Sequence, residues 1–178
     1  MMNFINKLTL AAAITIFAAS CGQSPNNSRT QSSATENTEQ KTSLNIGGTY
    51  SFGDGAEKGQ TGSVMIYPLS DNSALFYLDV CLGAPSYNSG TLFGEITITE
   101  NIGFYDSNID NEFLNCLLKF EFSSNQLKIT TDTESDDCGF GHGIDADHIY
   151  KLKDASIPEY YENMEGNRIM FKDLVNKQ

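Results

Sequence analysis

The chain has few histidines, few basic residues and no long hydrophobic run, and each shortage argues against a class of function. Only two of its 178 residues are histidines, and no serine lies in a Gly-x-Ser-x-Gly motif, so a catalytic triad has little to draw on. Both histidines, His142 and His148, lie in one glycine-rich stretch. Pairs of acids are abundant, but in so acidic a chain they say little about glycosidase chemistry. We therefore expect a protein that is not an enzyme.

Basic residues are outnumbered throughout the chain, which has 11 Lys and Arg against 23 Asp and Glu. From residue 44 onward the counts are 8 and 21. This excess repels phosphates, so nucleic acids and anionic lipid head groups are poor partners. It attracts basic proteins, cationic peptides and metal ions. The same excess also keeps exported domains soluble, so charge alone identifies no ligand.

The main apolar stretch spans only twelve residues, 8–19, whereas a membrane-spanning helix needs about 20. It follows a short segment with one positive charge, Lys7, and it ends in small residues, as secretory signal peptides do. We therefore expect this segment to be removed rather than retained as an anchor.

The four residues that close this stretch, Ala18-Ala19-Ser20-Cys21, resemble the lipobox of bacterial lipoproteins, although that family usually has Leu where Ala18 stands. The resemblance implies that residues 1–20 are a lipoprotein signal peptide and that Cys21 is lipidated, anchoring the chain to the bacterial cell envelope. Gly22, rather than Asp, follows the cysteine, which by analogy favours the outer membrane. The alternative is plain secretion with Cys21 as an ordinary residue.

Residues 21–43 contain the cysteine and then a polar segment rich in Ser, Thr, Gln and Asn. Such a composition cannot bury enough apolar surface to offset the entropy of ordering, so we expect a disordered tether. A flexible tether of this length has a root-mean-square span of about 25 Å. Residues 44–178 are long enough for one domain with a real core.

Strand signals dominate that domain, and turn residues separate them. We expect strands at 48–52, 62–68, 73–80, 91–99, 102–105, 113–122, 126–131 and 144–152. The tail, 158–172, reads as a hairpin because Gly166-Asn167 interrupts it, with a short amphipathic helix as the alternative. The pattern predicts an all-β domain, a small antiparallel β-sandwich or β-barrel of about eight to ten short strands.

A closed barrel of about eight strands can hold one small ligand, which keeps a ligand-carrier function open. Such a carrier would have an apolar cavity lined by residues such as Phe76, Leu78, Phe120 and Phe122. A scaffold without a ligand would bury the same residues in a packed core, and this is our default expectation.

The cysteines fit an exported protein. With Cys21 reserved for lipid, three remain: Cys81, Cys116 and Cys138. In a hairpin that turns near Ser124, Cys116 lies opposite a position near residue 133, from which a short stretch could lead Cys138 back to it. We therefore predict a Cys116–Cys138 disulfide, contributing about 3 kcal/mol. A Cys81–Cys138 bridge is the main rival.

An acidic stretch is the leading candidate for a binding site. It contains Asp132, Glu134, Asp136, Asp137, Asp145 and Asp147. Carboxylates on a glycine-rich loop can bind Ca²⁺, and they can also attract a cationic protein. The alternative is a solvated acidic loop that binds no ligand.

Two further patterns point to metals only weakly. Residues 106–112 begin as a calcium loop does, but Asn111 and Leu117 stand where that motif needs Gly and Glu, so we expect a polar turn. The spacing of Cys138, His142 and His148 supplies only three zinc ligands, one of them a cysteine in an oxidising compartment.

The small, acidic, disulfide-bearing all-β lipoproteins include lysozyme inhibitors, and this chain is similar to them in general character. We therefore expect a monomeric, membrane-anchored binding module for a cationic protein such as a lysozyme, or for a small ligand. The alternative is a structural or accessory envelope lipoprotein without a ligand pocket. Calcium could stabilise the fold in either case.

Overall fold

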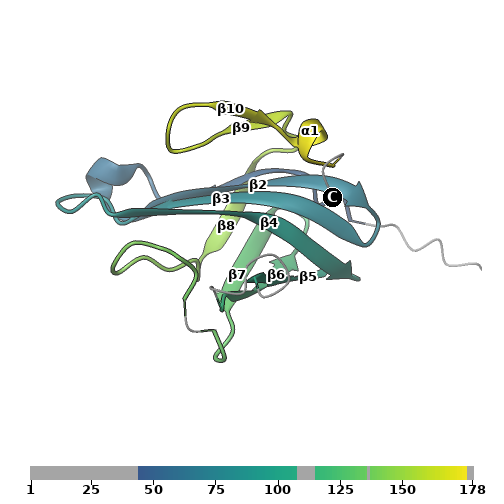
Figure 1. Cartoon of the computed structure of the whole chain (residues 1–178), viewed down its shortest axis with the longest axis horizontal. Helices are drawn as coiled ribbons and strands as arrows, with labels where there is room; N and C mark the ends of the chain where they lie inside the picture. The colour runs from purple at the N-terminus through teal and green to yellow at the C-terminus, as the bar shows by residue number, and fades with distance from the viewer. Residues whose placement is uncertain (1–43, 108–114, 136, 176–178) are drawn as a thin grey trace, which may run out of the picture. The chain divides into compact units, whose positions relative to one another are not determined.

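The computed structural model describes residues 44–107, 115–135 and 137–175, and the statements below concern these residues. Eight strands form a closed antiparallel barrel in chain order, and the last strand pairs back onto the first (Figure 1). They are β1 (Gly48–Phe52), β2 (Thr61–Ser70), β3 (Ser73–Cys81), β4 (Ser89–Thr99), β5 (Ile102–Asp106), β6 (Leu117–Phe122), β7 (Gln126–Thr131) and β8 (Ile149–Asp154). The all-β prediction is confirmed, and of its two architectures the barrel is the right one.

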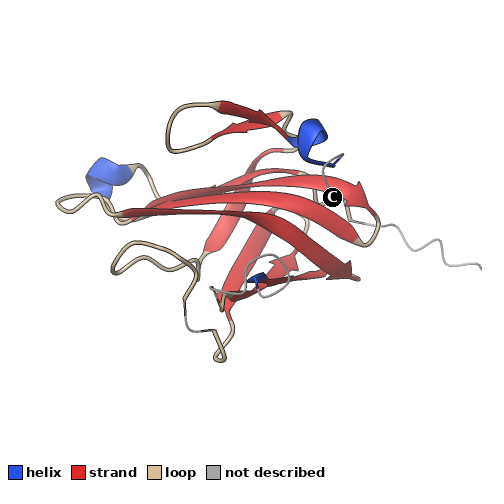
Figure 2. Cartoon of the chain, viewed as in Figure 1, coloured by secondary structure: helices blue, strands red, loops and turns tan. Residues whose placement is uncertain are grey.

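The remaining elements are short. A 3-10 turn, η1 (Ala56–Lys58), follows β1, and the tail forms a hairpin of β9 (Tyr160–Glu162) and β10 (Arg168–Met170). A five-residue helix, α1 (Phe171–Val175), ends the described chain (Figure 2). The tail is therefore the predicted hairpin, with one helical turn added after it.

Two predicted strands begin later than expected. The strand expected at 113–122 starts at Leu117, and the strand expected at 144–152 starts at Ile149. Residues 144–148, just before β8, form a loop with local hydrogen bonds: the Asp147 N–H donates to the Asp145 carboxylate, and the His148 N–H donates to the Ala146 carbonyl. β2 also differs from expectation, because it continues past Pro68 to Ser70 through an irregular register. A proline can remain in a strand where the ladder is already irregular.

The barrel interior is filled by side chains that alternate along each strand. Phe76 and Phe120 are fully buried, with ring centroids 5.0 Å apart, and Phe76 also meets Tyr105 edge-on at 5.1 Å. Gly94 faces these rings, and a Cβ on it would collide with Tyr105. Leu78 and Phe122 belong to the same core, so the four residues considered for a ligand cavity are packed against their neighbours. This agrees with an eight-stranded barrel whose interior is just wide enough for side chains.

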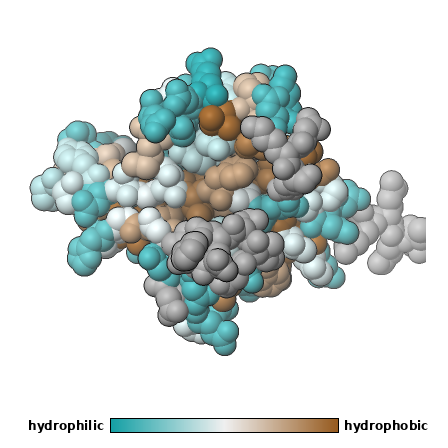
Figure 3. Space-filling view, in the orientation of Figure 1, coloured by the Kyte–Doolittle hydropathy of each residue, from teal (hydrophilic) through white to brown (hydrophobic). Residues whose placement is uncertain are grey.

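The tail covers part of the outer wall of the barrel. Tyr161 of β9 stacks on Tyr77 of β3, with ring centroids 4.1 Å apart, and Phe171 of α1 stacks on Tyr67 of β2 at 5.3 Å. Leu75, which points outward from β3, is buried beneath the tail. Figure 3 shows hydrophobic residues in a band across the strands below the tail, while the tail's own outer surface is mostly hydrophilic. The protein therefore has one core inside the barrel and a second, smaller one outside it.

Because successive strands run in opposite directions, the connections alternate between the two ends of the barrel. At one end, which we call the turn end, the connections are tight: residues 71–72, 100–101 and 123–125. At the other, the loop end, lie the longer connections 53–60, 82–88, 107–116 and 132–148. The described chain enters at the turn end, where Leu44 and Ile46 lie beside Pro68 and Ile98.

Candidate functional site: the loop end of the barrel

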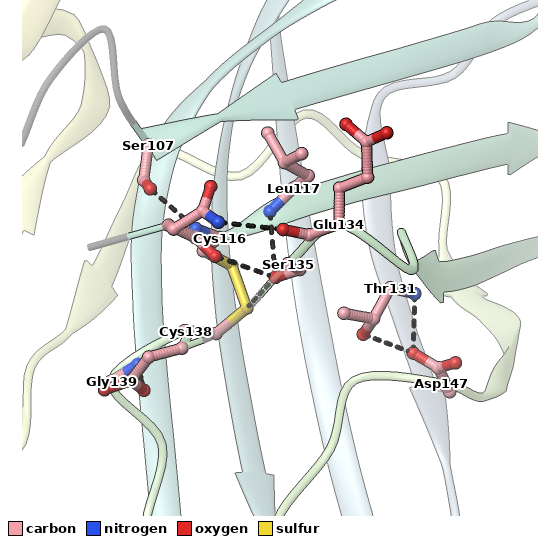
Figure 4. Close-up of a disulfide and its surroundings, with 11 residues drawn as sticks. Ser107, Cys116, Leu117, Thr131, Glu134, Ser135, Cys138, Gly139 and Asp147 are labelled. Atoms are coloured by element: carbon pink, nitrogen blue, oxygen red, sulfur yellow. Dashed lines mark hydrogen bonds between the residues drawn. A yellow bond between two sulfur atoms is a disulfide. The ribbon is translucent and has the colours of Figure 1, made fainter.

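A disulfide joins two of the four connections at the loop end. Cys116, just before β6, is bonded to Cys138 in the loop that follows β7 (Figure 4). The predicted pairing is confirmed, because β6 and β7 pair with Leu118 opposite Thr131, which places Cys116 close to the returning chain. Of the three cysteines that the structure describes, Cys81 is the free one, as expected, and it is partly buried. The disulfide fastens residues 132–148, which we call the acidic loop, to the start of β6.

Hydrogen bonds reinforce this connection on both sides of the disulfide (Figure 4). The Ser135 hydroxyl donates to the Asn115 carbonyl over 2.9 Å, and it accepts a bond from the Leu117 N–H at 3.2 Å. The Asn115 amide donates to the Glu134 carbonyl over 2.8 Å. Beneath them, the Cys116 N–H donates to the hydroxyl of Ser107, which is fully buried. These bonds satisfy backbone groups that loops would otherwise leave to water.

Most of the predicted acidic residues have a local structural role. The carboxylates of Asp132, Asp137 and Asp145 each accept a bond from the backbone N–H two residues further along the chain. Such contacts are typical of turns that begin with Asp. The Asp147 carboxylate accepts bonds from the backbone N–H and the hydroxyl of Thr131, so it ties the end of the loop to the end of β7.

The remaining two acidic residues differ from these four. Glu134 is exposed, and its carboxylate has no hydrogen-bond or ion-pair partner among the residues that the structure describes. Asp136 lies outside the described residues. The structure therefore brings five of the six predicted residues into one loop, four of them as acceptors of internal hydrogen bonds.

The acidic loop also closes its end of the barrel with apolar side chains. Phe140 packs over Gly90 of β4, where a Cβ would lie 2.6 Å from the ring, and Ile144 packs against the barrel core. The Asn88 amide donates to the His142 carbonyl over 2.9 Å, which links this loop to the connection 82–88. An open hollow of about 210 Å³ lies on the loop. Its lining residues are Thr131, Ser135, Asp137, Cys138, Phe140, Ile144 and Asp145.

A second contact between loops was not anticipated from the sequence. The Tyr87 hydroxyl donates to the Glu57 carboxylate over 2.8 Å, joining the connections 82–88 and 53–60. This bond to the Glu57 carboxylate raises the pKa of the Tyr87 phenol above its ordinary value. Tyr87 is 46% exposed although it is a large aromatic residue. The sequence shows a turn-forming loop with one aromatic residue at Tyr87. It does not identify Glu57 as the partner of Tyr87, because Glu57 lies 30 residues away.

The metal-binding patterns receive no geometric support from the described residues. Among them, no group of three or more His, Cys, Asp and Glu side chains is arranged to hold a metal ion. Of the calcium-like pattern, Asp106 ends β5, and residues 108–114 lie outside the described part. Cys138 is bonded to Cys116, so in this state it offers no thiolate to zinc. His148 instead stacks on Phe52, with ring centroids 3.8 Å apart.

The loop end has a strongly negative composition. By sequence, its four connections contain ten acidic residues and one basic residue, Lys58. Two of these acidic residues act on a group inside the barrel. The pKa of the Tyr150 phenol is raised first by burial and then by the charges of Asp145 and Asp147. The lysines of the barrel strands, in contrast, lie on the outer wall of β6, β7 and β8. Acidic residues also lie outside the loop end, and Glu121 of β6 pairs with Lys119 and Lys128, but the excess of acidic over basic residues is concentrated at the loop end.

Comparisons with protein families, with curated proteins and with solved structures find no match to this chain. In the part of the chain that the structure describes, no helix has the length and apolar character needed to cross a membrane. The functional argument therefore rests on the geometry and charge of the loop end.

Proposed function

We propose that this protein is a lipid-anchored binding module of the bacterial cell envelope whose loop end recognises a cationic protein, such as a lysozyme, and that it is not an enzyme. The observation that carries the proposal is the construction of the loop end. Its connections are held to one another by the Cys116–Cys138 disulfide and by the Tyr87–Glu57 and Asn88–His142 hydrogen bonds. Preorganised loops lose less conformational entropy when they bind a partner.

Charge supports a cationic partner over other ligands. The acidic excess of the four connections would accelerate the approach of a basic protein and would make its binding weaken with salt. A small apolar ligand is less well supported, because Phe76, Leu78, Phe120 and Phe122 pack against neighbours inside the barrel.

The position of the chain entry is compatible with a membrane tether. Leu44, the first residue that the structure describes, lies at the turn end, opposite the loop end. With acyl chains on Cys21, the domain would be held at the envelope, in the outer membrane by the analogy drawn above. Labelling of Cys21 with a radioactive fatty acid, and its loss in Cys21→Ser, tests the anchor independently of binding.

The binding test uses the chain from residue 21 with Cys21→Ser, which cannot be lipidated. The immobilised protein is exposed to envelope extract and host secretions at low salt, eluted with salt, and the eluted proteins are identified by mass. A purified lysozyme is then titrated directly, and its activity is measured with and without the protein. Retention of no basic protein at low salt would contradict the proposal.

Matched variants separate specific binding from general charge. Glu134→Gln with Asp137→Asn removes two charges at the loop end, and the amide oxygen introduced by Asp137→Asn can still accept the bond from the Gly139 N–H. Asp71→Asn with Glu159→Gln removes two charges elsewhere on the surface. We expect the first pair to weaken binding clearly more than the second, without a change in melting temperature.

One observation favours a second candidate function, a structural or accessory envelope lipoprotein. Four of the acidic side chains serve the folding of their own loop, as they would in a scaffold without a partner. A calcium-stabilised version of this scaffold predicts that calcium raises the melting temperature and that a chelator lowers it. An unchanged melting temperature would leave the scaffold without a calcium requirement.

A further inference from the structure

Tyr87 combines exposure with a backbone conformation that is unusual for its residue type. Its φ of 51° lies in the left-handed region, which bulky residues seldom adopt. Residues held in such conformations persist when their surroundings enforce them, and they are frequent at functional sites. The strain at Tyr87 therefore calls for a reason, and core packing is not that reason because nearly half of the residue is exposed.

The surroundings of Tyr87 hold it firmly. Its N–H donates to the Gly83 carbonyl over 2.8 Å, and the Leu82 N–H donates to the Asn88 carbonyl over 2.8 Å. Gly83 itself lies against the backbone of η1, where a Cβ would collide with the carbonyl oxygens of Ala56 and Gly59. The Ala84 N–H also donates to the Ala56 carbonyl, and this bond attaches the connection 82–88 to η1.

The chemistry of the pair suits a planar cation. A tyrosine ring attracts cations through its π electrons, and arginine stacks on aromatic rings more readily than lysine does. Glu57 accepts the Tyr87 bond through Oε2, which leaves its second carboxylate oxygen available for another donor. An aromatic surface beside a carboxylate thus offers both stacking and a charge-assisted hydrogen bond.

We propose that Tyr87 and Glu57 form a subsite that receives an arginine side chain of the cationic partner. This inference rests on the proposed function and gives it an anchor, since tyrosine and arginine are among the residues that most often dominate protein interfaces. The subsite adjoins the acidic loop through the Asn88–His142 bond. The acidic loop then supplies long-range attraction, Glu57 supplies a charge-assisted hydrogen bond, and the Tyr87 ring supplies the selectivity for arginine.

The test compares labelled hexaarginine and hexalysine peptides, which carry equal charge, by fluorescence anisotropy at low salt on the chain from residue 21 with Cys21→Ser. We expect the parent chain to prefer the arginine peptide by about fivefold, as cation–π stacking of ordinary strength would give. Tyr87→Asn should remove that preference, because Asn tolerates a left-handed backbone but has no ring. Tyr87→Phe should keep most of it, and Glu57→Gln should weaken binding of both peptides.

Controls and outcomes separate the two proposals. Phe104→Ala removes an exposed aromatic residue from the outer wall of β5, and it should leave the preference intact. Equal affinity for the two peptides, or an unchanged preference in Tyr87→Asn, overturns the subsite while leaving the cationic partner in place. If neither peptide binds at low salt, both the subsite and the cationic partner are overturned. Melting temperatures of all variants confirm that the folded protein is compared.

Discussion

The Asp147 carboxylate accepts two hydrogen bonds from Thr131, one from the backbone N–H and one from the hydroxyl. Asp147 is the last acidic residue of the acidic loop, and Thr131 is the last residue of β7. The contact therefore closes the base of the loop. It also changes how the acidic loop is to be tested. A substitution at Asp147 would alter both the charge of the loop and its structure.

Replacement of Asp147 by alanine should therefore lower stability. Loss of a carboxylate that accepts two bonds at an exposed site should cost about 1 kcal/mol of the free energy of unfolding. Asp147→Asn keeps an acceptor oxygen and should lose clearly less. Urea denaturation of both variants measures the difference, and equal losses would mean that charge rather than hydrogen bonding is responsible.

Opening the Cys116–Cys138 disulfide should have a larger effect. The bridge spans 22 residues of sequence, and releasing a loop of that length in the unfolded state removes about 3 kcal/mol of stability. The double substitution Cys116→Ala with Cys138→Ala avoids leaving an unpaired thiol. Urea denaturation should show the loss, and reductant should destabilise the parent chain but not this variant.

Cys81→Ala is the matched control for the disulfide, because Cys81 is the partly buried free cysteine. It should remain sensitive to reductant and close to the parent chain in stability. A Cys81→Ala protein that no longer responds to reductant would show that the bridge forms with Cys81 instead.

The disulfide and its hairpin were predictable because they depend on short-range patterns. Alternation of apolar residues sets the faces of β6 and β7, and the turn at 123–125 sets their register, from which the approach of Cys116 and Cys138 follows. The same reasoning works for most of the strands. The sequence does not distinguish a barrel from a sandwich, because the alternation of apolar residues shows which face of a strand is buried but not whether the sheet closes.

The contacts between loops that the sequence did not predict join residues that are far apart in the chain. Tyr87 contacts Glu57, which lies 30 residues away in the chain, and Phe140 packs on Gly90 near the start of β4. No local sequence pattern predicts either contact. The tail was ambiguous for a related reason. Its strands are three residues long, too short for a clear period, and they are held in place by Tyr161 packing on Tyr77 and Phe93.

Filling the space at Gly94 should destabilise the barrel. A Cβ at this position would collide with the ring of Tyr105 and lie 3.0 Å from Phe76, and protein cores are close-packed. Gly94→Ala should cost about 1–3 kcal/mol, as overpacking does. Thr97→Ala, on the exposed face of the same strand, should cost less, and chemical denaturation compares the two. A stable Gly94→Ala protein would indicate a looser interior with space for a ligand.

Loss of the Tyr161 ring should release the tail from the outer wall. The ring contacts Tyr77, Phe93 and Phe171, and it is 8% exposed. Its truncation to alanine should cost about 3 kcal/mol locally. Limited proteolysis should then cleave the tail before the barrel, whereas Met164→Ala in the exposed β9–β10 turn should not change the pattern. Unfolding of the entire protein in one step would show that the tail and barrel form a single cooperative unit.

Buried tyrosines should make the barrel sensitive to alkali. Burial raises the pKa of Tyr50 and Tyr150 above their ordinary value of about 10, and each hydroxyl donates to a backbone carbonyl, of Ile46 and Ala146 respectively. Above pH about 10 the unfolded chain loses these protons while the folded chain retains them, so the free energy of unfolding must fall as pH rises. Below that pH both states are protonated and these groups give no dependence.

Urea denaturation at pH 8, 10 and 11 should show this loss, and Tyr150→Phe should reduce its slope because one titrating group is removed. The same variant should be slightly less stable at pH 8, where it lacks the bond to the Ala146 carbonyl. The two effects have opposite signs, so the stability curves of the parent and the variant should approach each other as pH rises. Parallel curves would mean that Tyr150 ionises as readily in the folded protein as in the unfolded chain, which its burial beside Asp145 and Asp147 argues against.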